Sequence, residues 1–192
     1  MLGNVLLGFK DVLEVGKSPF ADCSLGKLSE MSPVKYGNPD ASLSLTLEAY
    51  KNCPIENGSW EGERGDSKWK PDPEYVPQKR NPEGKSWEEI MKEHKIDGVE
   101  YKNGEPDFKD VSKGKVEIES YTSDRDDNFD KADIEMAKKK GCDPEDVAKW
   151  RKENGYTWHE RGDMRTMEKV PSIVHNNVSH RGGISAAKAE GK

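Results

Sequence analysis

The spacing of apolar and polar residues predicts a mixture of short helices and strands in residues 86–178. Helices are predicted where apolar positions recur along one face, and strands are predicted where apolar and polar positions alternate. The predicted helices span residues 87–95, 127–140, 144–154 and 172–178, and the predicted strands span residues 116–121, 156–160 and 165–170. This mixture, which ends in the order strand, turn, strand, helix, predicts an α+β fold.

Local signals mark the ends of several of these elements. Ser86 and Glu89 have the spacing of a capping box, which begins a helix by satisfying its first backbone N–H groups. Gly141 follows a run of lysines and is a typical helix end. The dipeptide Asn103-Gly104 predicts a tight turn.

The N-terminal part of the chain is predicted to be a loop-rich arm. Serine, glycine, proline and asparagine interrupt its short apolar runs, so residues 1–56 read as a linker, with one strand or short helix near residues 43–50. Residues 58–85 read as an ordered loop for the same reason. Residues 57–192 then form one domain. Hydrophobic residues make up 32% of the chain and charged residues 35%, so we expect a small core with long solvated loops.

Several classes of protein are excluded by the composition. No apolar run approaches the roughly 18 residues of a membrane-spanning helix, so none is expected. The apolar start of the chain lacks a basic segment and is too short for a signal peptide. Cys23, Cys53 and Cys142 are odd in number, widely spaced and without a C-x-x-C pair, which argues against a disulfide scaffold or a cysteine zinc site.

Charge and histidine are unevenly distributed. The net charge is −6, but residues 137–192 hold 12 Lys and Arg against 8 Asp and Glu, a net charge of +4. The rest of the chain is strongly acidic. Three of the four histidines, His159, His175 and His180, also lie near the C-terminus. Because histidine is the commonest residue for metal binding and proton transfer near neutral pH, this end of the chain is the candidate site.

The residues at this end suit the hydrolysis of a phosphodiester, which needs a base, a cation and positive charge to hold phosphates. His159 or Glu160 is the candidate base. His175 and His180, with one further nitrogen or oxygen donor, are candidate ligands of a divalent cation. The candidate contacts to the nucleic-acid backbone are Arg161, Arg165, Lys169 and Arg181. The alternative is that His175 caps a small core or lies on a solvated helix face.

A shared metal site places one condition on the predicted helix at residues 172–178. His175 and His180 are five residues apart, so on one continuous helix their side chains diverge by about 140°. The helix must therefore end before His180. Gly182 and Gly183, just beyond, support an end there.

These residues resemble the C-terminal signature of the HNH/endonuclease VII (His-Me finger) nuclease toxins, in the branch named for a Trp-His-His motif. The resemblance covers about residues 57–188. Its C-terminal motifs are Thr157-Trp158-His159-Glu160, Met167, Val170-Pro171, His175-Asn176 and His180-Arg181-Gly182-Gly183. Its upstream blocks are Gly58 to Trp69, Gly104-Glu105-Pro106-Asp107-Phe108 and Arg125-Asp126-Asp127-Asn128-Phe129.

The resemblance implies a small ββα-metal finger at about residues 156–183, packed on a mixed helix and strand body. It implies one divalent metal ion (Mg²⁺, Mn²⁺ or Zn²⁺) and endonuclease activity against DNA, with RNA as the alternative. It also implies a cognate immunity protein that blocks the site. The module is then the C-terminal tip of a larger toxin, secreted by a bacterium and delivered into the cytoplasm of a target cell.

One departure from the family pattern affects the catalytic roles. The second position of the Trp-His-His doublet, usually assigned as the general base, is Glu160 in this chain. Either His159 binds the cation and Glu160 is the base, or His159 is the base and Glu160 is a ligand or orients it. Two other functions fit the same residues. One is a non-catalytic module that binds nucleic acid or protein and holds a structural metal, and the other is an inactive toxin remnant.

Overall fold

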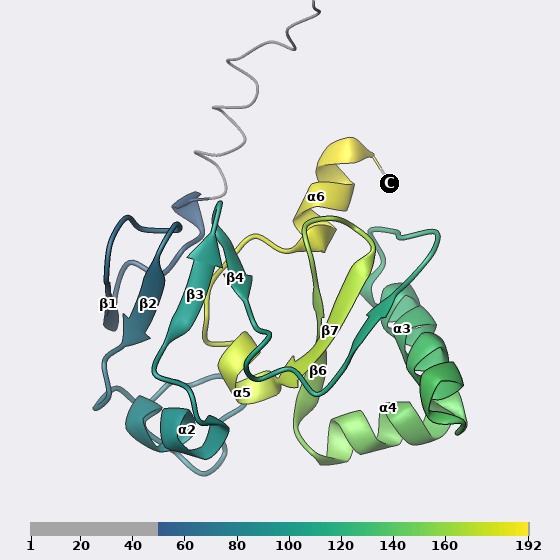
Figure 1. Cartoon of the computed structure of the whole chain (residues 1–192), viewed down its shortest axis with the longest axis horizontal. Coiled ribbons are helices and arrows are strands. Elements are labelled where there is room, and N and C mark those ends of the chain that lie inside the picture. Colours follow the sequence, from purple (N-terminus) through teal and green to yellow (C-terminus); the bar gives the residue numbers. More distant parts are fainter. Residues whose placement is uncertain (1–49, 192) are drawn as a thin grey trace, which may run out of the picture. The chain divides into compact units, whose positions relative to one another are not determined.

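The computed structural model describes residues 50–191, which contain two small antiparallel sheets and five helices (Figure 1). The strands are β1 (Gly58–Trp60), β2 (Lys68–Pro71), β3 (Val99–Lys102), β4 (Glu105–Asp107), β5 (Lys115–Glu117), β6 (Tyr156–Glu160) and β7 (Thr166–Pro171). The helices are α2 (Trp87–His94), α3 (Arg125–Lys140), α4 (Pro144–Glu153), α5 (Ser172–His175) and α6 (Gly183–Glu190). The α+β prediction is confirmed. The predictions for the arm at residues 1–49 lie outside the described residues.

The first sheet has the strand order β1-β2-β3-β4, and every neighbouring pair is antiparallel. The turn predicted at Asn103 and Gly104 joins β3 to β4, and both residues have positive φ angles of 52° and 77°. The prediction of a loop over residues 58–85 was wrong for β1 and β2. Trp69 of β2 is buried and packs edge-on against Trp87 of α2, so the pairing of β2 rests on contacts distant in sequence.

Helix α2 begins at the predicted capping box. The Ser86 side chain accepts a hydrogen bond from the backbone N–H of Glu89, and the Glu89 carboxylate accepts one from the backbone N–H of Ser86. The helix ends at Lys95, which has the left-handed conformation that commonly closes helices. Its buried face, Trp87 and Ile90, packs in the core beside the first sheet.

The second sheet has the order β5-β7-β6 and contains two strands of the segment where the finger is predicted. Strands β6 and β7 form an antiparallel hairpin in which His159 lies opposite Glu168, and α5 follows β7 directly. Strand β5 pairs with the other edge of β7. The strand predicted at residues 116–121 ends at Glu117, and Ser120 has a positive φ angle of 52° that breaks the extended backbone.

Helices α3 and α4 contact β5 and β6 of this sheet (Figure 1). Helix α3 begins at Arg125, two residues earlier than predicted, because the Asp124 side chain accepts hydrogen bonds from the first free backbone N–H groups. Its buried apolar residues are Ala132, Met136 and Ala137, whereas Ile134 is 40% exposed.

The buried face of α3 also carries a polar network. The carboxylate of Asp133 accepts hydrogen bonds from Nε and an Nη of Arg151 on α4, at 3.2 and 2.6 Å. It accepts a third from the indole Nε1 of Trp158 on β6, at 2.8 Å. All three side chains are buried, so the network ties α3, α4 and β6 together.

The two faces of the second sheet pack into different cores. One core holds Trp158 and Met167 with the buried residues of α3 and α4. The other holds Val170 and Val174 with Phe108 and the residues of the first sheet and α2. Because consecutive side chains of a strand point to opposite faces, β6 sends Trp158 into the first of these cores and His159 toward the second.

The end of α5 meets the condition for a shared site. The helix predicted at residues 172–178 ends at His175, so His180 lies in the loop that leads to α6. Helix α6 was not predicted from the sequence. No helix in residues 50–191 is long and apolar enough to cross a membrane.

Candidate functional site

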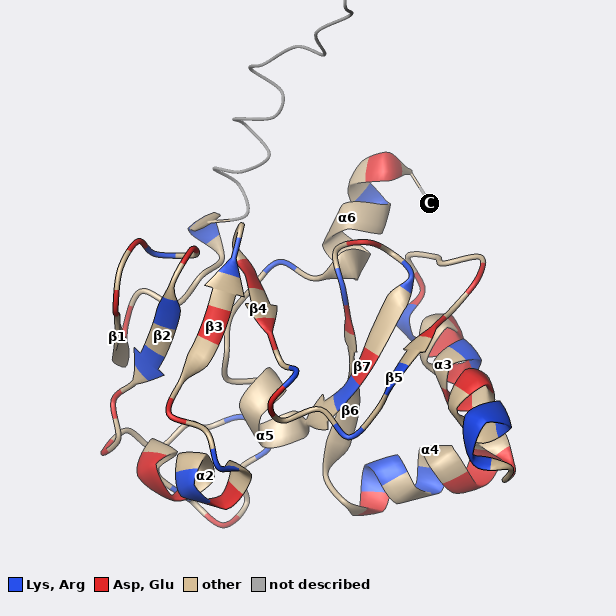
Figure 2. Ribbon diagram, viewed as in Figure 1, with Lys and Arg blue, Asp and Glu red and all other residues tan. Residues whose placement is uncertain are grey.

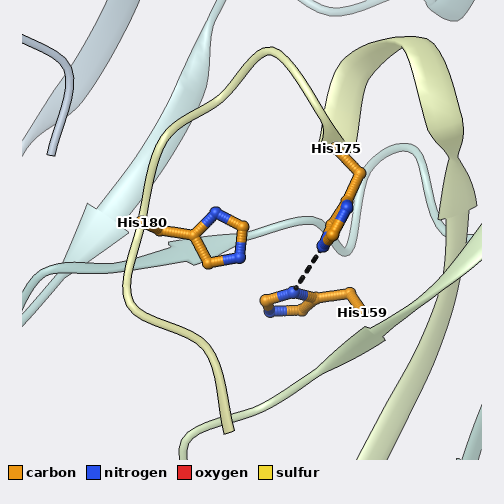
Figure 3. Close-up of side chains that lie close together, drawn as sticks. All are labelled: His159, His175 and His180. Atoms are coloured by element: carbon orange, nitrogen blue, oxygen red, sulfur yellow. Dashed lines mark hydrogen bonds between the residues drawn. The ribbon is translucent and has the colours of Figure 1, made fainter. Parts of the chain in front are cut away.

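His159, His175 and His180 converge from three different segments, and we call them the histidine cluster (Figure 3). His159 comes from β6, His175 from the last position of α5, and His180 from the loop that follows. One ring nitrogen from each lies within 4.8 Å of the others. The closest pair is Nδ1 of His159 and Nε2 of His175, which are 3.3 Å apart. The three predicted residues therefore share one site.

The histidine cluster, in which His159 is buried and His175 and His180 are partly buried, packs against one aromatic ring. Phe108, which follows β4, contacts all three imidazoles, with ring centroids 4.9, 5.7 and 5.9 Å apart. Burial lowers the pKa of each histidine, to about 3 for His175 and well below the usual value for His159. Mutual repulsion among the positively charged forms acts in the same direction for His159 and His175. The rings are thus neutral at pH 7, which is the form that binds metal ions.

The geometry of the cluster fits a divalent ion. Two nitrogens bound tetrahedrally to one ion at about 2.0–2.1 Å are about 3.3 Å apart, the distance found between His159 and His175. Nδ1 of His180 donates a hydrogen bond to the Val178 carbonyl at 2.8 Å, so Nε2 of this neutral ring keeps its lone pair. Hydrogen-bonded imidazoles with a free second nitrogen are the usual metal-binding arrangement.

The structure does not bring Glu160 into the histidine cluster. Glu160 follows His159 on β6, so its side chain points to the opposite face of the sheet. There its two carboxylate oxygens accept hydrogen bonds from Nε of Arg125 at 3.0 Å and from Nδ2 of Asn128 at 3.1 Å. Burial raises the pKa of Glu160, and these two donors oppose the rise.

The carboxylate beside His159 is instead Glu105 of β4. Its Oε1 lies 3.9 Å from Nε2 of His159 and accepts hydrogen bonds from Nε of Arg161 at 3.2 Å and from the backbone N–H of Gly162 at 2.9 Å. Nε2 of His159 is buried and has no hydrogen-bond partner within residues 50–191. Glu105 is therefore the carboxylate that this nitrogen faces in the described part of the chain.

The four predicted backbone contacts have different surroundings. Arg161 lies beside the cluster, held by Glu105 and 3.7 Å from Glu168. Arg165 is exposed and forms an ion pair with Glu117 at 2.7 Å. Lys169 is buried on the face opposite the cluster, with its Nζ 4.3 Å from the centre of the Trp150 ring. Arg181 follows His180 directly in the loop before α6.

Lys and Arg are interspersed with Asp and Glu along several elements around the site, as Figure 2 shows for α3, α4 and β7. This is consistent with the modest net charge of +4 in the C-terminal part of the sequence.

Three residues around the site were not predicted to act there: Glu105, Phe108 and Arg125. All three lie in the upstream blocks of the family resemblance, which was their only sequence signal. Their roles depend on how β4 and α3 pack against the finger. Local patterns do not contain that information.

The loop after His180 packs closely against the hairpin. A Cβ atom at Gly183 would lie 2.5 Å from the Arg161 carbonyl oxygen and 2.5 Å from the Tyr121 hydroxyl. Only glycine fits without displacement of these atoms. The close approach holds the segment that carries His180 against β6.

Comparison with known families gives one match in the same part of the chain. Residues 98–182 match the family model described as the DNase/tRNase domain of colicin-like bacteriocin. The matched segment begins just before β3 and includes the whole histidine cluster, Glu105 and Arg125. A comparison with curated proteins finds no match. The similarity is therefore to a family of nuclease toxin domains, and it coincides with the candidate site.

Proposed function

We propose that this chain is the endonuclease module of a bacterial toxin and that it hydrolyses phosphodiester bonds in DNA with the help of a divalent metal ion. The observation that carries the proposal is the convergence of three neutral imidazoles within 4.8 Å, inside the segment that matches a nuclease toxin family. Strand β6, helix α5 and the loop after α5 each supply one ligand, in the strand, strand, helix order that the HNH (His-Me finger) resemblance implies.

His159, His175 and His180 hold the ion in this proposal. Three protein ligands leave the fourth position of a tetrahedral site open for substrate or water, as catalytic zinc sites do. An ion held by these three residues would supply Lewis-acid chemistry, by polarising the scissile phosphate and by lowering the pKa of bound water, to about 7 in the case of zinc. Mg²⁺ and Mn²⁺ are the other candidate ions.

Glu105 orients His159 in this arrangement. Since Nδ1 of His159 faces His175, its proton belongs on Nε2, which points toward Oε1 of Glu105 at 3.9 Å. A carboxylate in this position favours the correct tautomer and makes the ring a stronger ligand. Phe108 fixes the ring planes from the apolar side.

Arg161 and Arg181 are the predicted residues best placed to hold the nucleic-acid backbone. Arg161 lies next to the cluster on the Glu105 side, and Arg181 follows a cluster residue. Lys169 is not proposed as a contact, because its side chain is buried on the other face of the sheet. A cognate immunity protein that covers the site completes the proposal, with delivery into a target cell as part of a larger secreted toxin.

Plasmid cleavage by the purified chain tests the proposal. We expect nicking in the presence of Mg²⁺, Mn²⁺ or Zn²⁺, and a loss of at least about 100-fold for His159→Ala, in the range for removal of an essential catalytic group. His94→Ala is the matched control, because His94 is a half-buried histidine on α2 outside the cluster. Full activity of the His159→Ala variant contradicts the proposed role.

RNA is the second candidate substrate, because the matching family includes tRNases as well as DNases. Parallel assays on plasmid DNA and on transfer RNA distinguish the two. If the protein cleaves RNA but not DNA, RNA is the substrate, and the proposed metal site is unaffected by that result.

A non-catalytic module with a structural ion is the alternative function, favoured by the burial of the cluster. Removal of the ion with a chelator separates the two. A structural ion stabilises the fold, so its removal lowers the melting temperature by many degrees. A catalytic ion in a site preformed by Phe108 and α5 leaves the fold largely intact and abolishes turnover. An inactive remnant gives no turnover with any ion and no growth arrest when expressed alone.

A further inference from the structure

Arg125 combines an exposed guanidinium with a buried anchor. Its side chain is 61% exposed, whereas the Glu160 side chain that it contacts is 4% exposed. Only Nε of Arg125 is used, in the 3.0 Å hydrogen bond to Oε2 of Glu160. Within residues 50–191, the two terminal nitrogens of the guanidinium donate no hydrogen bond, and Glu160 is the one ion-pair partner of Arg125. Arg125 is thus held at one edge while its donor pair stays available.

The position of Arg125 is unfavourable for the helix that contains it. It is the first residue of the 16-residue helix α3, where the helix dipole disfavours a positive charge. The helix start is already stabilised by Asp124, whose side chain accepts hydrogen bonds from the backbone N–H groups of Asp126 and Asp127. Arg125 therefore contributes nothing to capping, and its presence calls for another explanation.

Glu160 is anchored independently of Arg125. Its second oxygen accepts a hydrogen bond from Nδ2 of Asn128, which is fully buried, and the amide oxygen of Asn128 in turn accepts one from the backbone N–H of Thr122. The carboxylate is therefore fixed before Arg125 binds it. A fixed carboxylate orients a guanidinium that would otherwise sample many rotamers.

Arg125 is held next to the strand and the loop that carry His159 and His180. Glu160 follows His159 directly on β6, and the Glu160 carbonyl oxygen is 3.4 Å from the position of a Cβ atom at Gly182, so the loop that carries His180 packs at this point. Arg161, by contrast, is already bound between two carboxylates, Glu105 and Glu168.

We propose that Arg125 is a substrate-binding residue that contacts a backbone phosphate of the nucleic acid beside the histidine cluster, and that Glu160 is the positioning residue that presents it. This inference rests on the proposed function for the class of ligand, a phosphodiester chain. The two free nitrogens of the guanidinium match the oxygens of a phosphate group. It also gives Glu160, the departure from the family doublet, a role that does not require proton transfer.

The salt dependence of binding tests this role of Arg125 without any cleavage. On duplex DNA, removal of one protein–phosphate interaction lowers the slope of log affinity against log salt by about 0.9. The test measures the affinity of the full chain for a fluorescent DNA duplex and for an RNA hairpin, with a chelator present, between about 50 and 200 mM salt. Arg125→Gln is expected to reduce the slope by about one such interaction, and Arg125→Lys is expected to restore it because the charge returns.

Lys149→Gln is the matched control. It removes the same charge from a side chain that is 71% exposed on α4 and that lies 4.0 Å from Glu153, a weak surface ion pair. Its slope is expected to equal that of the unchanged protein. Equal slopes for Arg125→Gln and Lys149→Gln on both nucleic acids overturn the proposal. So does an Arg125→Lys variant that folds, by its thermal melting curve, and still shows the reduced slope.

Glu160→Gln separates this role from that of a base. If Glu160 only positions Arg125, the Glu160→Gln variant keeps a hydrogen-bonding side chain and its cleavage rate stays within about tenfold of that of the unchanged protein. If Glu160 is instead the general base, turnover falls by about 100-fold or more while the salt-dependence slope of binding is unchanged, since a general base contributes typically 10²- to 10⁴-fold. That result overturns the assignment of Glu160. Absence of cleavage by the unchanged protein counts against the proposed function, while the binding slopes still decide the role of Arg125.

Discussion

Replacement of Asp133 by asparagine tests the network that holds β6 in place. The substitution keeps the size of the side chain and removes its charge. Asp133 accepts hydrogen bonds from two guanidinium nitrogens of Arg151 and from the indole of Trp158. In the unchanged protein, three donors converge on the two carboxylate oxygens of Asp133, whereas the amide of asparagine offers only one acceptor oxygen. Arg151 is then left buried without a negative partner.

The structure sets the size of the expected loss. The Asp133 and Arg151 side chains are 3% and 8% exposed, so solvent does little to screen the pair. Removal of one partner of a buried ion pair costs about 3–5 kcal/mol, mainly because the remaining charge stays in a medium of low polarity. For a protein of this size, each kcal/mol lowers the melting temperature by about 2–4 °C. We therefore expect a decrease of roughly 6–20 °C.

Urea denaturation followed by circular dichroism measures the free energy of unfolding. Asp130→Asn is the matched control, because Asp130 is an exposed residue on the same helix, and its effect is expected to lie within about 0.5 kcal/mol. The double variant Asp133→Leu with Arg151→Met removes both charges and is expected to recover most of the loss. An Asp133→Asn variant within about 1 kcal/mol of the unchanged protein would refute the reasoning.

Three further predictions concern the cluster and the cysteines. In the metal-free protein, the pKa values of the cluster histidines are lowered, so the free energy of unfolding is at its full value above about pH 6.5. It decreases below that pH by up to about 1.4 kcal/mol per pH unit for each histidine. A urea midpoint that is constant from pH 7 to pH 4 contradicts this prediction. Gly183→Ala forces a Cβ atom against the Arg161 carbonyl and is expected to lower the free energy of unfolding by about 1–3 kcal/mol. It is also expected to weaken metal binding, as measured by calorimetry. Ser185→Ala, on the exposed side of α6, is the control and is expected to have little effect on either quantity. Burial raises the pKa of Cys53 to about 11, so iodoacetamide at neutral pH should label the exposed Cys142 first, which peptide mass spectrometry detects.

The elements that the sequence predicted are those whose ends depend on neighbouring residues. The capping box at Ser86, the turn at Asn103 and Gly104, and the glycine end of α3 each use hydrogen bonds between residues close in the chain. Strand β2 depends on pairing with β3, about 30 residues away, as in the register of Lys68 with Glu100, and β1 pairs in turn with β2. Their glycine, proline and charged residues resemble a loop, so local patterns did not identify them.

The candidate site also contains residues that the sequence could predict and residues that depend on the tertiary structure. The three histidines were predicted because they are rare in this chain and gather near one end. Glu160 was expected to act beside His159, but neighbouring residues on a strand point to opposite faces, and its side chain lies away from the histidine cluster. Glu105 and Arg125 reach the site through the packing of β4 and α3, which depends on the tertiary structure and is not encoded in any short motif.

The packing of Phe108 against all three imidazoles has a consequence for any attempt to reduce this protein to a minimal catalytic peptide. An excised fragment that starts at Tyr156 carries every nitrogen ligand but leaves behind the ring on which they rest, together with the outer strand at Lys115–Glu117. Solvent would then reach the imidazoles, and their protonation and spacing would no longer be controlled. Trimming from the amino terminus should therefore stop well before Glu105, and the smallest active unit is expected to be most of the folded body.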